Sequence, residues 1–214
     1  MKKILFLLLC TFALMIGAYP LLYLFVEPQD TFLSSKSPEL LKSMIWETAF
    51  FAHIIFGGIS LFIGWRQFGV RFRRRYPELH KIVGKIYVGS VFISSLSAVY
   101  LGIFANGGLV PALGFVFLGI AWFGTTFYSL KYIRRKNFIR HRKLAVYSYA
   151  CTFAAVTLRL WYPLLVKTTE NPEFSYALVA WLCWLPNLYV AYIINKKNGM
   201  IQETAVENRE AKVK

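Results

Sequence analysis

The sequence predicts an all-α protein, a polytopic membrane helix bundle with six transmembrane helices. The chain has 214 residues, of which 57% are hydrophobic, and its mean hydropathy is +0.49. Several apolar runs reach the ~20 residues that a helix needs to cross a bilayer. Backbone groups in hydrocarbon must be satisfied within the segment, and these runs lack the alternating polarity of barrel strands, so we expect helices.

The expected spans follow one another along most of the chain, at residues 4–26, 44–66, 85–105, 110–130, 144–166 and 175–195. The first follows Lys2 and Lys3 like a signal peptide, but it continues to Val26 without an A-x-A site, so we expect an uncleaved helix. The sequence "NGG" at 106–108 predicts a tight turn between the third and fourth spans. Residues 196–214 form a polar tail that we expect to be disordered.

The net charge of +15 is concentrated on one side of this arrangement. All basic residues except Lys36, Lys42, Arg159 and Lys167 precede the first span, follow the sixth, or lie between spans two and three or four and five. The positive-inside rule makes that side cytoplasmic. We therefore expect a bacterial inner-membrane protein with both termini in the cytoplasm. This distribution favours anionic membrane lipids as partners and argues against a nucleic-acid partner.

Familiar enzyme and metal motifs are missing from the sequence. There is no nucleotide-binding loop, H-E-x-x-H or serine nucleophile elbow, and whether the protein is an enzyme stays open. Cys10, Cys151 and Cys183 lie in expected helices without a C-x-x-C spacing, which argues against a metal site or a disulfide framework.

The second expected helix carries a stripe of mostly small residues on one face: Ala49, His53, Gly57, Ser60 and Gly64. Small residues let neighbouring helices approach closely, so this face should contact protein. At 1.5 Å per residue His53 lies roughly 13 Å below the outer surface, near the bilayer centre.

The fifth expected helix has a matching polar face, formed by Ser148, Thr152, Ala155 and Arg159. A buried arginine stays protonated and needs a partner or a water-filled cavity. Glu47, one and a half turns above His53, is an available anion. We therefore expect a cluster of Glu47, His53 and Arg159 between helices two and five. Two interpretations stay open: a structural ion pair, or a site for a small-molecule ligand, a quinone or a proton.

His80 and His141 each precede a helix on the cytoplasmic side, after a cluster of arginines. The stretches "RRRYPELHKIVGKIYV" and "RRKNFIRHRKLAVYSY" also resemble each other, which is compatible with a duplicated helical hairpin. Two facing imidazoles are candidate ligands of a haem b iron, with nearby arginines for its propionates. The alternative is that both histidines contact only lipid phosphates or helix ends. The cofactor, if there is one, stays open.

Three motifs, "HIIFGGISLFIGWRQF", "ELHKIVGKIYV" and "RHRKLAVYSYACTFAAVTLR", resemble a bacterial family of predicted membrane proteins catalogued as domain of unknown function 2306. The resemblance covers roughly residues 44–195 and implies an integral membrane protein without a settled activity.

A second resemblance is to six-helix di-haem b-type cytochromes and their ferric-reductase relatives. Its pattern matches His53, Gly57, Gln67, Arg75, His80 and Gly84. It implies a haem- or quinone-dependent electron-transfer protein in which His80 and His141 hold one haem. The position expected for a ligand opposite His53 is Gly114, so a second haem lacks a histidine.

Overall fold

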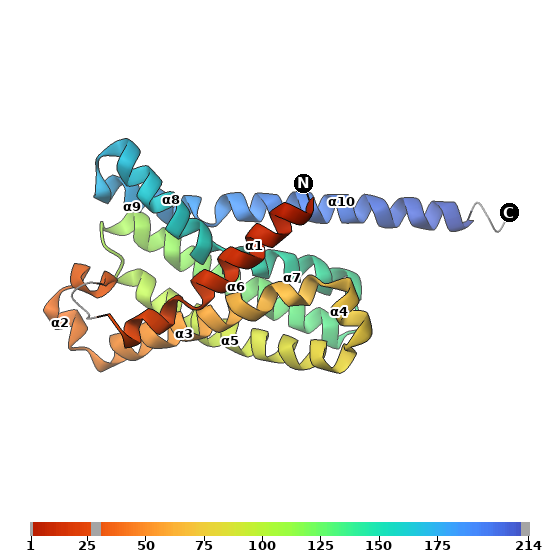
Figure 1. Cartoon of the computed structure of the whole chain (residues 1–214), viewed down its shortest axis with the longest axis horizontal. Coiled ribbons are helices and arrows are strands. Elements are labelled where there is room, and N and C mark those ends of the chain that lie inside the picture. Colours follow the sequence, from red (N-terminus) through yellow and green to blue (C-terminus); the bar gives the residue numbers. More distant parts are fainter. Residues whose placement is uncertain (1, 27–30, 211–214) are drawn as a thin grey trace.

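The computed structural model describes residues 2–26 and 31–210, and the regular structure in this part of the chain is entirely helical (Figure 1). Five helical segments are long and apolar enough to cross a membrane: Met44–Phe68, Pro77–Ile103, Leu109–Arg134, Phe138–Thr169 and Pro172–Gly199. They correspond to the second to sixth expected spans. The prediction of an all-α protein with several membrane-type helices is confirmed.

The first expected span differs, and six crossings are not confirmed. Helix α1 (Lys2–Gly17) gives way to the 3₁₀ helix η1 (Tyr19–Leu24), and the apolar helix Leu7–Tyr23 is shorter than the five spans. Pro20 explains the change, because proline lacks the N–H of an α-helical bond and its ring clashes with the carbonyl four residues earlier. Helix α1 crosses α3 obliquely (Figure 1).

A bundle of four helices forms the centre of the molecule, and each helix packs against the next: α3 (Met44–Gly64), α5 (Pro77–Ile103), α6 (Leu109–Arg134) and α7 (Phe138–Thr152). The expected turn before α6 is present, because Gly107 and Gly108 have φ angles of +79° and +82°. Such angles suit glycine.

Short elements close the two ends of the bundle. At one end, the 3₁₀ helix η4 (Trp65–Phe68) and α4 (Val70–Arg75) form a basic turn between α3 and α5. At the other end lie η3 (Phe32–Ser35) and α2 (Pro38–Leu41) (Figure 1).

The last two expected spans are each broken into two helices. The fifth divides at Phe153 into α7 and α8 (Ala154–Thr169), and the sixth divides into α9 (Pro172–Leu182) and α10 (Leu185–Glu210). Pro186 explains the second break, because its ring would clash with the carbonyl of residue 182 in a continuous helix.

The two breaks are joined to each other by side chains. Asn187 Nδ2 donates to the carbonyl oxygens of Ala150, in the last turn of α7 (3.3 Å), and of Cys183, in the second break (2.9 Å). The Thr157 hydroxyl also donates to the Cys183 carbonyl. Polar side chains thus satisfy main-chain groups at the broken helices, as hydrocarbon surroundings require.

Helix α10 continues beyond residue 195, where the expected sixth span ends, and projects past the bundle (Figure 1). The tail that we expected to be disordered is helical as far as Glu210, and residues 211–214 lie outside the described residues.

Candidate ligand site at Arg159 and the polar interior

A network of buried hydroxyl groups links α5, α6 and α7. The Tyr87 hydroxyl lies 2.8 Å from Ser148 Oγ and 2.9 Å from Thr152 Oγ1. Trp122 Nε1 donates to Thr152 Oγ1 (2.9 Å), and Thr126 Oγ1 lies 2.6 Å from Ser148 Oγ. All five side chains are buried. The network therefore ties three helices together, and Ser148 and Thr152 serve the bundle core.

Arg159 lies on the other side of the break at Phe153 and faces different neighbours. Its guanidinium carbon is 4.3 Å from the centroid of the Tyr19 ring, a cation–π contact with η1. Its Nη1 donates to the carbonyl of Ala155 in its own helix (2.9 Å). Tyr23, whose ring is 6.1 Å from that of Tyr19, is also within electrostatic range of the guanidinium. The arginine is therefore half-buried between α8 and η1.

His53 is held against α5 by two reciprocal contacts. Its Nδ1–H donates to the carbonyl of Ser94 (3.0 Å), and the Ser94 hydroxyl donates to the carbonyl of His53 (2.8 Å). A Cβ at Gly57 would lie 3.0 Å from Ser94 Oγ, so the small residue permits this approach. His53 is also within electrostatic range of Arg159. No hydrogen bond joins His53 to Arg159 in the described residues, and His53 is bonded to α5 instead.

Glu47 does not join them. Its side chain is exposed in the first turn of α3, and the ion pair found within residues 2–26 and 31–210 is Lys81–Glu78 (2.7 Å). Six residues separate Glu47 from His53, which turns it about 240° around the helix, toward a different side. The expected Glu47–Arg159 ion pair is therefore absent from the described part of the chain.

Tyr19 and Tyr23 are the neighbours of Arg159 that the sequence analysis missed. They lie in "YPLLY" at the end of the first apolar run, where Pro20 stops α1. Aromatic residues with a polar tip at the end of an apolar run are a signal of a membrane interface. That signal could have drawn attention to them, but their contact with α8 depends on packing between distant segments.

His80 and His141 both lie at the opposite end of the bundle, in the first turns of α5 and α7. Their charges are close enough to interact, and Arg73 acts on both. His141 Nδ1–H donates to the carbonyl of Ser129 (3.0 Å), and the Ser129 hydroxyl donates to the carbonyl of His141 (3.2 Å), the same arrangement as His53 and Ser94. His80 Nδ1 is buried and has no hydrogen bond in the described structure. The helical hairpins thus bring these two imidazoles into one region.

The comparison with known families decides the membership of the chain. A family model described as "Predicted membrane protein (DUF2306)" matches residues 50–195. The chain belongs to this family. No curated protein matches the chain, and no solved structure does. The region of this DUF2306 protein that matches contains His53, His80, His141 and Arg159, whereas Tyr19 lies outside it.

The chemistry available to the DUF2306 protein lies in two places. At Arg159 a permanent cation, a histidine and two phenols can bind an anion and exchange a proton. At His80 and His141 two imidazoles can serve as ligands or proton carriers. Within the described residues, no group of three or more His, Cys, Asp or Glu side chains could hold a metal ion.

Proposed function

We propose that this DUF2306 protein is a multi-pass membrane protein that binds a small organic anion at Arg159, between α8, η1 and α3. The observation that carries the proposal is the missing counter-charge of the Arg159 guanidinium. It is a permanent cation inside an apolar span, and no carboxylate of the described chain forms an ion pair with it.

The charge balance of the spans supports this proposal. Between residues 48 and 169 the sequence contains one carboxylate, Glu78, and that group pairs with Lys81. Stacking on Tyr19 contributes about 1–2 kcal/mol, less than the few kcal/mol that a charge costs inside a membrane. A carboxylate ligand would supply the missing negative charge and match the planar fork of the guanidinium.

The surrounding structure supports a ligand site as well. His53 can change its charge as an anion arrives, which would couple anion binding to proton binding. Arg159 also follows the break at Phe153, and transporters build substrate sites from discontinuous helices. Binding with transport, coupled to a proton, is therefore the activity that we expect at this site.

The experiment titrates the full chain in detergent with an anion and measures its melting temperature at each anion concentration. Acetate and benzoate are the probes, with chloride at the same ionic strength as the control. A ligand at ten times its Kd stabilises by about 1.4 kcal/mol, which raises Tm by roughly 3–6 °C. We expect this rise in the wild type and its loss in Arg159→Gln, while Arg140→Gln, at an exposed arginine, keeps it.

A wild type insensitive to both carboxylates would refute the anion site. Glu27 and Asp30, in the loop between the first two expected spans, lie outside the described residues. Their amide variants test whether the chain supplies its own counter-charge. If E27Q/D30N lowers Tm as much as Arg159→Gln does, Arg159 is a structural ion-pair partner and the proposal fails.

The orientation in the membrane is part of the same proposal. We infer that α1 with η1 is a sixth crossing and that the basic turns face the cytoplasm of a bacterial inner membrane, with both termini on that side. The basic turns around α4 and after α6 lie at one end of the bundle, which supports it (Figure 1). A reporter enzyme that is active only in the cytoplasm, fused to the C-terminus, tests this orientation, and an inactive fusion contradicts it.

A second candidate function is haem- or quinone-dependent electron transfer, for which the placement of His80 and His141 at the same end of the bundle is the supporting observation. His141 fits a haem ligand, because Nδ1 bonded to a carbonyl leaves Nε2 for iron. His80 lacks that second bond. An absorption spectrum of protein from haem-replete cells tests this function. A Soret band lost in H80A and H141A supports it, and a colourless preparation excludes haem.

A further inference from the structure

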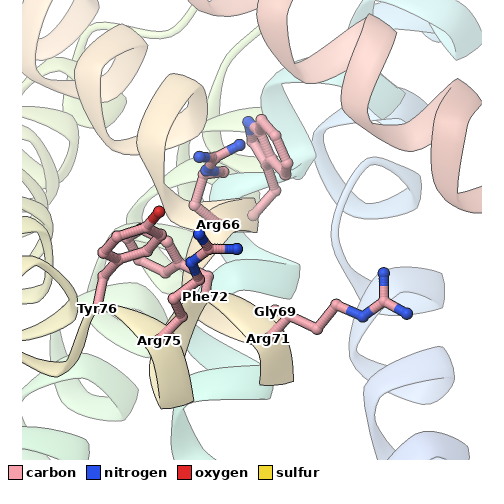
Figure 2. Close-up of a pocket in the computed structure, with 7 residues that line it drawn as sticks. Arg66, Gly69, Arg71, Phe72, Arg75 and Tyr76 are labelled. Carbon is pink, nitrogen blue, oxygen red and sulfur yellow. The ribbon is translucent and has the colours of Figure 1, made fainter.

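A cavity of about 320 Å³ lies beside the basic turn that follows α3. Three arginines and three aromatic rings line it: Arg66, Arg71, Arg75, Trp65, Phe72 and Tyr76. Figure 2 shows the guanidinium groups of Arg66 and Arg75 near the rings of Phe72 and Tyr76, whereas Arg71 extends away from them. Water occupies about 30 Å³ per molecule in the liquid, so the cavity has room for a phosphate group and its substituents.

The rings make cation–π contacts with two exposed arginines, Arg66 and Arg75. The guanidinium carbon of Arg66 is 5.2 Å from the ring centroids of both Trp65 and Phe72, and that of Arg75 is 5.6 Å from the centroid of Tyr76. Such contacts restrict the side chain and leave guanidinium N–H groups able to donate to a ligand. The two arginines are thereby oriented before any ligand arrives.

No carboxylate lines the cavity, so its positive charges are uncompensated by the residues around it. Glu78, the carboxylate nearest in sequence, is exposed and engaged with Lys81 (2.7 Å). Like charges gathered in this way repel each other, and an anion that bridges them removes the repulsion. Guanidinium groups restricted in this way are suited to the bidentate recognition of phosphate.

The cavity also lies at the depth of lipid headgroups. It follows directly on the apolar helix α3, and Trp65 and Tyr76 are the residue types that mark a membrane–water interface. We propose that this cavity binds the phosphate of an anionic phospholipid, with Arg66 and Arg75 as the phosphate-binding residues. This site is separate from Arg159 and does not depend on the function proposed above.

A second basic turn at the same end of the bundle provides a matched control. A second basic cavity of about 350 Å³ is lined by Lys131, Arg134 and Arg135 at the end of α6. No cation–π contact orients either of these arginines in the described structure; the stacked cation there is Lys131, 5.7 Å from the Tyr128 ring. The double variants R66Q/R75Q and R134Q/R135Q remove equal charge at the same end of the bundle.

The experiment measures the melting temperature of the full chain in neutral detergent during titration with phosphatidylglycerol. Phosphatidylcholine with the same acyl chains and inorganic phosphate are the comparison ligands. We expect phosphatidylglycerol to raise Tm with a half-saturating concentration that increases about tenfold or more in R66Q/R75Q, since each charge-assisted bond is strong. R134Q/R135Q should stay within about twofold of the wild type.

Two outcomes overturn the proposal. In the first, both double variants weaken phosphatidylglycerol binding equally, which indicates diffuse charge attraction. In the second, phosphatidylglycerol and phosphatidylcholine stabilise the chain equally. Stabilisation by inorganic phosphate at the same concentration as the lipid retains the phosphate site but overturns its assignment to a lipid. Where R66Q/R75Q fails to fold, R66K keeps the charge and removes the stacked fork, and unchanged lipid affinity in R66K refutes the arrangement.

Discussion

Replacing Thr152 with valine tests whether the buried hydroxyl network stabilises the bundle. Valine has nearly the shape of threonine but neither donates nor accepts a hydrogen bond. The variant removes the bonds of Thr152 Oγ1 with the Tyr87 hydroxyl (2.9 Å) and with Trp122 Nε1 (2.9 Å). Tyr87 keeps Ser148 as a partner, whereas the buried indole N–H of Trp122 loses the acceptor that it has in the structure.

The expected loss follows from these two bonds. Interhelical hydrogen bonds in membrane proteins average about 0.6 kcal/mol each, so two contribute about 1.2 kcal/mol. A buried donor left without an acceptor adds about 1 kcal/mol or more. The total of about 2 kcal/mol corresponds to a decrease in Tm of roughly 4–8 °C for a chain of this length.

The assay is thermal unfolding of the purified chain in detergent, with Thr168→Val as the matched control. Thr168 is exposed, and its hydroxyl donates only to carbonyls of its own helix, those of Leu164 and Leu165. We expect its Tm to change by no more than about 2 °C. A Thr152→Val protein that melts with the wild type, or a Thr168→Val protein that loses as much, would refute the reasoning.

Two further variants test the packing and the outer turn. Gly64→Ala places a Cβ 2.7–2.8 Å from aromatic rings of α5 and α7. We expect thermal unfolding to show a loss of stability of about 1–3 kcal/mol. Gly89→Ala has open space around it and should be neutral or stabilising. Lys36 Nζ donates to Asn106 Oδ1 (2.8 Å) at the turn before α6. Lys36→Met should therefore increase proteolysis of the loop between the first two expected spans, whereas Lys42→Met, at an exposed site, should leave it unchanged.

Much of the site could be predicted from local sequence. The helical stripe that contains His53 and Gly57 correctly indicated a face against protein, because side chains three and four residues apart share a side. The isolated basic residue inside an apolar run made Arg159 a candidate site residue, and its role stays a prediction. The partner assigned to it was the weak point, since Glu47 was chosen by depth along the helix without regard to its direction around it.

Other parts of the site depend on segments that are distant in the sequence. The first α-helix ends near Pro20, and the break before Leu185 is explained by Pro186, so both have local causes that a sequence can reveal. The break at Phe153 has neither proline nor glycine beside it. Its main-chain carbonyl at Ala150 is satisfied by Asn187, from another helix.

The sequence by itself determined which kinds of segment the protein contains. These are apolar runs of membrane length, basic turns at one end of the bundle, and a cation within a span. These properties follow from composition and from periodicity along single helices. The tertiary structure decided which groups meet. It interrupted the fifth expected span at Phe153, and it placed Arg159 of α8 over the Tyr19 ring and Thr152 of α7 in the bundle core. The reason is physical: contacts between helices depend on packing across the whole bundle, which no single segment encodes.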